Sequence, residues 1–134
     1  MATQISPMLA VSDAEAAIAF YKRAFGAEER WRIGEPAQVA GLSIDGAEVF
    51  LAQESPPNGT RSPDVAGYTT VRIELFADDP QQVQERAIAA GARAGSAVEE
   101  RRHETVGATP NLRMLQGGVI DPFGHVWLIG KFLE

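Results

Sequence analysis

Cysteine is absent from this 134-residue chain, and only two histidines are present. Without thiols there can be no disulfide, no thiolate metal site and no cysteine nucleophile. Two histidines far apart in sequence, His103 and His125, also make a site with several imidazole ligands an unusual construction. We interpret His125 as structural and His103 as part of a solvated charged loop. The sequence therefore predicts no metal site and no cofactor.

Long apolar runs and an excess of cations are also missing. No run approaches the roughly 18 to 20 apolar residues that a membrane helix needs, and residues 1–4 lack the features of a signal peptide, so we expect a cytoplasmic protein with no membrane partner. The 12 Lys and Arg residues against 18 Asp and Glu give a net charge of −6. This acidity argues against a nucleic-acid partner, which requires a basic face. Hydrophobic residues make up 45%, enough for one compact domain.

The first half of the chain reads as strand, helix and three strands. A strand is expected over 4–11, and Ser12 with Glu15 offers a capping box for the helix that follows. The apolar residues of this helix recur with helical spacing, and Gly26 ends it. Strands are expected over 27–33, 38–44 and 47–53, with Asp45-Gly46 as a hairpin turn. We assign residues 1–54 to this first module.

The same order then returns after a connector. Residues 55–67 contain so many prolines and glycines that no regular element is expected there. A strand over 68–76, a helix beginning at Asp79-Pro80 and strands over 94–100, 112–120 and 124–132 follow. Asp78 and Gly91 are separated by thirteen residues, as are Asp13 and Gly26. Two copies of one βαβββ unit are predicted, the second being 68–134.

Two motifs identify a family resemblance. The stretch from Pro7 to Ala27, PMLAVSDAEAAIAFYKRAFGA, and the stretch from Asp121 to Trp127, DPFGHVW, resemble the vicinal oxygen chelate superfamily of glyoxalase and bleomycin-resistance proteins, in particular its PhnB-like branch. The resemblance implies an α+β fold in which two βαβββ modules form a curled mixed-sheet cup. It places the helices on the convex side and the ligand in the cup, and it implies a homodimer.

The resemblance also bears on metal binding. Metal-dependent members hold a divalent ion on four inward His, Gln or Glu side chains. Motif spacing places Ser6, Phe50, Arg72 and Leu128 at those positions in this chain. A hydroxyl, a phenyl, a guanidinium and an isobutyl group cannot hold a divalent cation. The resemblance to metal-dependent enzymes therefore does not extend to their metal site.

Strand parity predicts which side chains face the cup. Val71, Ile73 and Leu75 suit the helix-covered face, which leaves Arg72 and Glu74 on the cavity wall. These two charges either pair with each other or await ligand groups. The predicted ligand-binding residues are Trp31, Phe50, Arg72, Glu74, Met114 and Leu128.

Two functional hypotheses remain from the sequence. The first is a metal-free, homodimeric small-molecule-binding protein that sequesters, for example, an antibiotic or an aromatic metabolite. The alternative is a glyoxalase-type lyase, isomerase or epimerase with a non-standard metal or an acid–base site such as Glu74 with Arg72. No catalytic residue is assigned.

Overall fold

The first half of the chain folds as one mixed sheet with a helix on one side. The computed structural model describes residues 1–107 and 111–134. The strand order of the first sheet is β1-β4-β3-β2, with β1 parallel to β4 and the other neighbours antiparallel. Its elements are β1 (Met8–Val11), α1 (Ala14–Phe25), β2 (Glu28–Ile33), β3 (Val39–Ile44) and β4 (Ala47–Gln53).

The second half repeats this plan after a short connector. The connector holds a 3-10 turn, η1 (Pro56–Asn58), and a short helix, α2 (Pro63–Ala66). The second sheet has the order β5-β9-β8-β6, with β7 also pairing β8, and β5 is parallel to β9. Its elements are β5 (Arg72–Phe76), α3 (Pro80–Ala90), β6 (Arg93–Ala94), β7 (Glu99–His103), β8 (Leu112–Ile120) and β9 (Val126–Phe132). The predicted α+β fold with a duplicated unit is confirmed.

Several predicted boundaries were wrong. β1 begins at Met8 rather than residue 4, and β5 at Arg72 rather than residue 68, while the connector contains two short helical turns. The predicted strand over 94–100 is interrupted between β6 and β7. A Cβ at Gly117 would lie 2.7 Å from both the carbonyl oxygen of Ser96 and the amide nitrogen of Val98. The backbone between β6 and β7 therefore packs directly against Gly117 of β8 at this break.

Helix α1 begins and ends as its sequence dictates, except for its cap. Asp13, not Ser12, is the N-cap, and its carboxylate accepts a hydrogen bond from the amide of Ala16. The predicted capping box does not form, because the Glu15 carboxylate accepts hydrogen bonds from the backbone amide of Ala37 and from the side chain of Arg32. Gly26 closes the helix in the left-handed region, at φ 68°.

Each sheet has one face covered by a helix and one open face. Along β4, β5 and β9 the odd-numbered residues point toward the helices, and the even-numbered ones alternate with them on the other face. Val49, Leu51, Trp127 and Ile129 are buried, whereas Phe50 and Leu128 are only half-buried. This alternation confirms the predicted strand parity.

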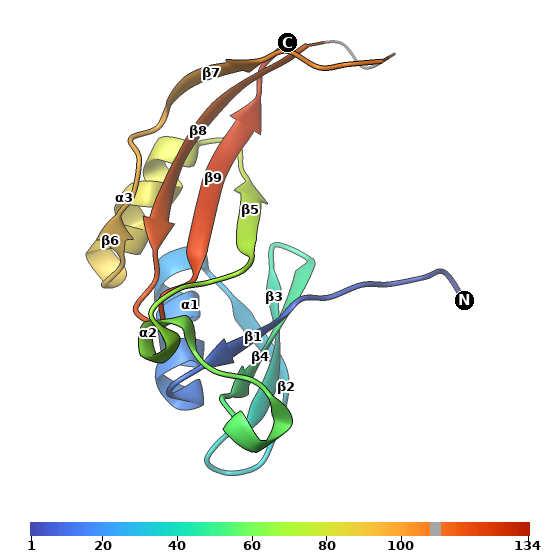
Figure 1. Cartoon of the computed structure of the whole chain (residues 1–134), viewed down its shortest axis with the longest axis vertical. Helices are drawn as coiled ribbons and strands as arrows, with labels where there is room; N and C mark the ends of the chain where they lie inside the picture. The colour runs from blue at the N-terminus through green and yellow to red at the C-terminus, as the bar shows by residue number, and fades with distance from the viewer. Residues whose placement is uncertain (108–110) are drawn as a thin grey trace.

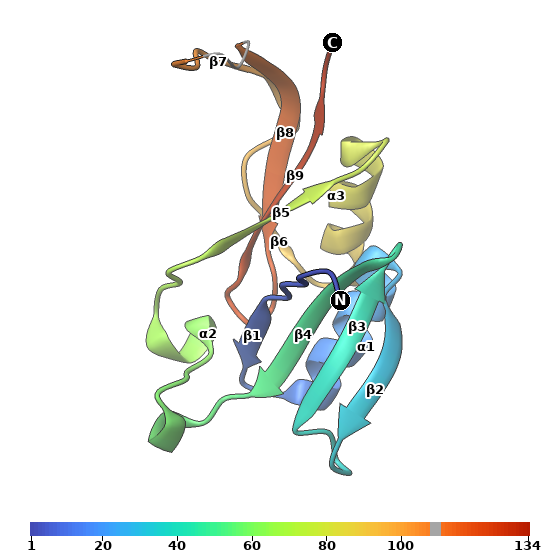
Figure 2. The ribbon, with the colours of Figure 1, turned by 90° about the vertical axis from the view of Figure 1, so that its right-hand side faces the viewer.

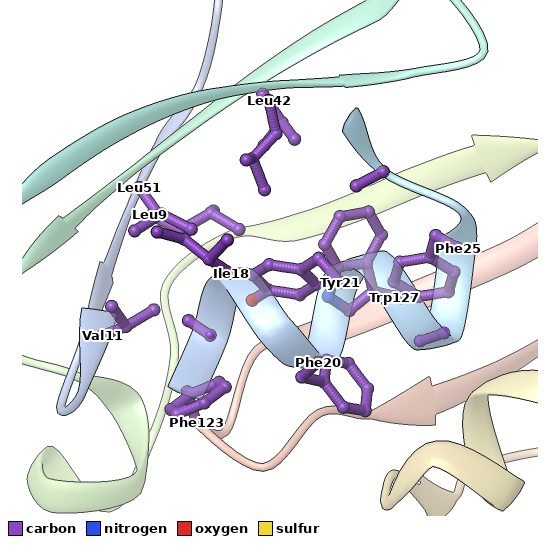
Figure 3. Packing of buried hydrophobic residues seen from close by; sticks show 14 of the residues in the cluster. Leu9, Val11, Ile18, Phe20, Tyr21, Phe25, Leu42, Leu51, Phe123 and Trp127 are labelled. Atoms are coloured by element: carbon purple, nitrogen blue, oxygen red, sulfur yellow. The ribbon is translucent and has the colours of Figure 1, made fainter. Parts of the chain in front are cut away.

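One hydrophobic core joins the two halves. Figure 3 shows Tyr21 and Phe25 of α1 packed beside Trp127 of β9, with ring centroids 5.5 and 4.6 Å from the indole. Residues of β1, β3 and β4 approach the same helix from the first sheet. Helix α1 therefore contributes to the cores of both modules. None of the described helices is long and apolar enough to cross a membrane.

The two open faces of one chain do not converge. Figure 1 shows α1 and α3 on the same side of the molecule, packed against each other. Figure 2 shows the first sheet with its open face toward the viewer and α1 behind it, while the second sheet is seen nearly edge-on. No described strand of one sheet pairs with the other. A single chain therefore presents two open sheet faces, not one closed cup.

Candidate ligand-binding site

An aromatic wall stands on the open face of the first sheet. Trp31 of β2 makes an edge-to-face contact with Phe50 of β4, with ring centroids 5.1 Å apart. The indole lies directly over Gly41 of β3, where a Cβ would come within 2.3 Å of two ring atoms. Trp31 keeps 39% of its surface exposed. The strands thus hold a large, exposed aromatic ring in a fixed position, which is typical of ligand-binding surfaces.

Charged residues stand on the open face of the second sheet. Arg72 and Glu74 are both exposed on β5, as the parity prediction requires. Glu74 accepts a hydrogen bond of 3.0 Å from the side-chain amide of Gln116 on β8. No ion pair joins Glu74 to Arg72 among the described residues. Of the two alternatives left open by the sequence, the pairing of Arg72 with Glu74 is therefore wrong.

The remaining predicted site residues lie on the second sheet as well. Leu128 of β9 is the register partner of Glu74 and is half-buried. Met114 of β8 lies farther along the same face, but at 4% exposure it offers almost no surface to a ligand. Phe76 and Phe132 stack beside it with ring centroids 4.8 Å apart, and both are about half exposed. This stacked pair was not predicted from the sequence.

The six predicted site residues thus fall into two groups. Trp31 and Phe50 touch each other on the first sheet, whereas Arg72, Glu74, Met114 and Leu128 lie on the second. Sequence reasoning missed Gly41 and Gln116. A glycine inside a predicted strand is the signal that could have identified Gly41, because such a glycine marks the close approach of another group. Nothing in the strand pattern identifies Gln116 as the partner of Glu74.

A groove of about 1030 Å³ opens where the two halves of the chain meet. It lies between the β3–β4 hairpin, the edge strand β5 and the first turns of α3. Its apolar lining includes Phe25, Leu75 and Val83, and Glu74 and Phe76 reach it from β5. Of the predicted site residues, only Glu74 lines this groove.

The residues at the family's metal positions do not fit a divalent ion. Ser6 precedes β1, Phe50 carries a phenyl ring, and Arg72 and Leu128 lie on the second sheet. These four side chains supply one hydroxyl oxygen and no imidazole or carboxylate. The part of the chain that the structure describes also holds no cluster of three or more His, Asp or Glu side chains with metal-binding geometry. The donor set is thus unsuited to the metal chemistry of metal-dependent glyoxalases.

The two histidines have other positions. His125 is 7% exposed, and its Nε2 lies 2.7 Å from the carbonyl oxygen of Ala10, so it links the β8–β9 turn to β1. This contact supports the structural interpretation of His125. His103 is the last residue of β7 and is exposed. It lies in a strand, not in the predicted loop.

Comparisons with known proteins agree with this geometry. The model of the glyoxalase-like domain matches residues 7–129. An uncharacterized protein of Mycobacterium bovis is 35% identical over 133 residues, which cover 95% of this chain and 82% of that protein. A structure from Arabidopsis thaliana superimposes with a TM-score of 0.71 at 23% identity, covering 98% of this chain and all of that one.

The fosfomycin resistance protein FosX of Mesorhizobium loti has the same fold, with a TM-score of 0.62 at 16% identity, over 98% of this chain and 92% of that one. The family match spans nearly the whole chain and includes both open faces and the β8–β9 turn. The chain belongs to the glyoxalase-like domain family of the vicinal oxygen chelate superfamily.

Proposed function

We propose that this protein binds a small organic molecule on its open sheet faces without a resident divalent metal. The observation that carries the proposal is the residue set at the family's metal positions, Ser6, Phe50, Arg72 and Leu128. With no ligand set for a metal, recognition falls to aromatic, apolar and charged side chains on these faces. We also place the chain in the PhnB-like branch, on its motifs Pro7–Ala27 and Asp121–Trp127.

Binding and sequestration of an aromatic compound, such as an antibiotic or a metabolite, fits the residues present. The Trp31 ring offers a flat face that Gly41 and Phe50 keep in position. Stacking of an aromatic ligand on such a ring requires no catalytic group from the protein. Arg72 and Glu74 on the other open face supply the polar groups that fix the orientation of a ligand.

We propose that the site is assembled between two copies of the chain. The open faces point in different directions within one chain (Figure 2), so neither face is covered by the other. Both also carry exposed apolar side chains, among them Met8 at 55%, Ile33 at 60% and Phe132 at 53%. Since β1 and β5 are edge strands, a two-fold pair can bring the first sheet of one copy opposite the second sheet of the other. Sedimentation is expected to give about twice 14.4 kDa, and a strictly monomeric mass at micromolar concentration would contradict this assembly.

A thermal-shift screen in the presence of EDTA tests the proposed binding. A compound that uses the open faces should raise the melting temperature of the wild type with or without EDTA. It should have no effect on Trp31→Ala. Tyr68→Ala is the matched control, because Tyr68 is an exposed aromatic residue outside both sheets. Stabilisation that requires an added divalent metal would refute the metal-free mode of binding.

The alternative is a glyoxalase-type lyase, isomerase or epimerase. Glu74 favours it, because its carboxylate stands on an open face and is oriented by Gln116, as a general base would need to be. In this alternative function, Arg72 would stabilise negative charge on the substrate. Turnover that Glu74→Gln abolishes without loss of binding would support catalysis over sequestration.

A further inference from the structure

Arg72, on the open face of the second sheet, has no acidic partner among the described residues, and neither has Arg93 of β6 at the opposite edge of that sheet. Arg30, in the β2 bulge, pairs with Glu28, and Arg101 of β7 lies 3.8 Å from Glu99. Among the described residues, Arg72 makes no side-chain hydrogen bond and no ion pair. This is notable in a chain with 18 acidic and 12 basic side chains.

Glu74, the other charged residue of β5, has a partner other than Arg72. Glu74 lies two residues along β5, and its Oε1 accepts the amide of Gln116 on the second sheet. Both residues lie on the edge strand β5, but the Glu74 carboxylate is held by a side chain of β8. The register partner of Arg72 is Val126, and Leu128 follows on the same face of β9. The register neighbours of Arg72 on β9 are therefore apolar and offer its guanidinium no acceptor side chain.

We propose that Arg72 is the receptor for an oxyanion group, a carboxylate or phosphonate, on the ligand of the open faces. This inference rests on the proposed function and names the class of ligand, an aromatic organic anion. A guanidinium presents two parallel N–H donors to such a group and remains charged at any pH the protein tolerates. In the proposed pair of chains, the ring of the ligand would meet Trp31 and Phe50 of the second copy.

The overall acidity of the protein does not oppose this proposal. Exposed charges are largely screened beyond about 8 to 10 Å at physiological ionic strength, so the net charge of −6 acts weakly on a bound ligand. The direct contact with Arg72 is much shorter. The affinity of a bound anion therefore depends mainly on its contact with Arg72. Glu74, about 7 Å away along the strand, opposes this contact in part. The more distant carboxylates lower the association rate of the anion more than its affinity.

The test compares naphthoate with its neutral analogue naphthamide by isothermal titration calorimetry. We expect the wild type to bind naphthoate about tenfold or more tightly than naphthamide, because a charge-assisted hydrogen bond is stronger than a neutral one. Arg72→Gln should remove this difference, and Arg72→Lys should retain part of it. Arg61→Gln is the matched control: Arg61 is exposed, has no hydrogen-bond partner among the described residues and lies in the connector.

The outcomes separate this inference from the proposed function. Equal binding of the two probes by the wild type would overturn the anion receptor, yet it would leave the open faces as a site for neutral aromatic ligands. A preference for naphthoate that survives in Arg72→Gln would also overturn it, since another cation would then be responsible. Failure of naphthoate to bind the wild type contradicts the inference as well, whereas the EDTA screen decides the proposed function independently.

Discussion

The hydroxyl of Tyr21 donates a hydrogen bond of 2.5 Å to the carboxylate of Asp121, and 100 positions separate the two residues. Tyr21 belongs to the helix of the first half, and Asp121 to the β8–β9 turn of the second. The same buried carboxylate accepts the indole N–H of Trp127 at 2.9 Å and the backbone amides of Phe123 and His125. One side chain therefore fixes the turn and joins the two modules.

Asp121→Ala is expected to be strongly destabilising. It leaves four buried donors without their acceptor, and each unsatisfied buried group costs about 1 to 3 kcal/mol, so a loss of at least about 4 kcal/mol in the free energy of unfolding is expected. Tyr21→Phe removes one of these donors and should cost about 1 kcal/mol. Urea denaturation measures both. Glu104→Ala, on an exposed residue, is the control, and an Asp121→Ala variant as stable as this control would contradict the role of Asp121.

The burial of the Tyr21 phenol also predicts a loss of stability at alkaline pH. Burial raises the pKa of the Tyr21 phenol well above its usual value, and the negative charge of Asp121 raises it further. The folded state therefore keeps the phenol proton at a pH where the unfolded chain releases it. This contribution to stability is complete below about pH 10, the pKa of an unperturbed tyrosine, and declines as the pH rises above that value.

Urea midpoints measured from about pH 8 to about pH 11 test the role of Tyr21. The wild type should lose stability above about pH 10, and Tyr21→Phe should lose less over the same interval. Tyr68→Phe is the control, because Tyr68 is 71% exposed. Identical pH profiles for the wild type and Tyr21→Phe would exclude Tyr21 as the titrating group.

Much of the fold could be predicted because local signals agreed with the final structure. The apolar stripe of α1, the Gly26 stop and the alternation of Arg72, Ile73 and Glu74 all follow from helix and strand periodicity. The prediction of Ser12 as the N-cap was wrong because neighbouring residues compete to cap a helix. Asp13 caps α1, and the Ser12 hydroxyl instead donates a hydrogen bond of 2.9 Å to the carboxylate of Asp64. That partner is 52 positions away, so no local pattern could reveal it.

The candidate site was less predictable because it depends on how the halves meet. Parity correctly placed Arg72 and Glu74 on an open face, yet whether they pair depends on Gln116, which a different strand supplies. The groove beside β5 likewise depends on the position of the β3–β4 hairpin against the second module. Contacts of this kind arise from tertiary packing, and strand periodicity carries no information about them.

Gly41→Ala should displace the Trp31 ring. A Cβ at this position would lie 2.3 Å from the indole, and the glycine is not in the left-handed region, so the clash is with the side chain alone. Because Trp31 is partly exposed, the ring can move outward, and its fluorescence should shift toward that of a solvated indole. In a double-mutant cycle, Trp31→Ala should cancel the stability cost of Gly41→Ala. Additive effects of the two substitutions would show that the ring does not depend on Gly41.

Two neighbouring positions of β9 test the assignment of the sheet faces. Ile129 is fully buried on the helix side, and Ile129→Ala should cost about 2 to 5 kcal/mol through the cavity it leaves. Leu128 is half-buried on the open face, and Leu128→Ala should cost about 1 kcal/mol or less. The free energy of unfolding in urea measures both. A larger loss for Leu128→Ala than for Ile129→Ala would invert the two faces.

Metal analysis of the protein purified without chelator tests the central claim most directly. The side chains at Ser6, Phe50, Arg72 and Leu128 cannot supply the imidazole and carboxylate donors that a divalent ion requires. Elemental analysis by plasma mass spectrometry should therefore find zinc, nickel, iron and manganese far below one equivalent per chain. A stoichiometric amount of any of these metals that survives gel filtration would contradict the account and favour a metal-dependent enzyme.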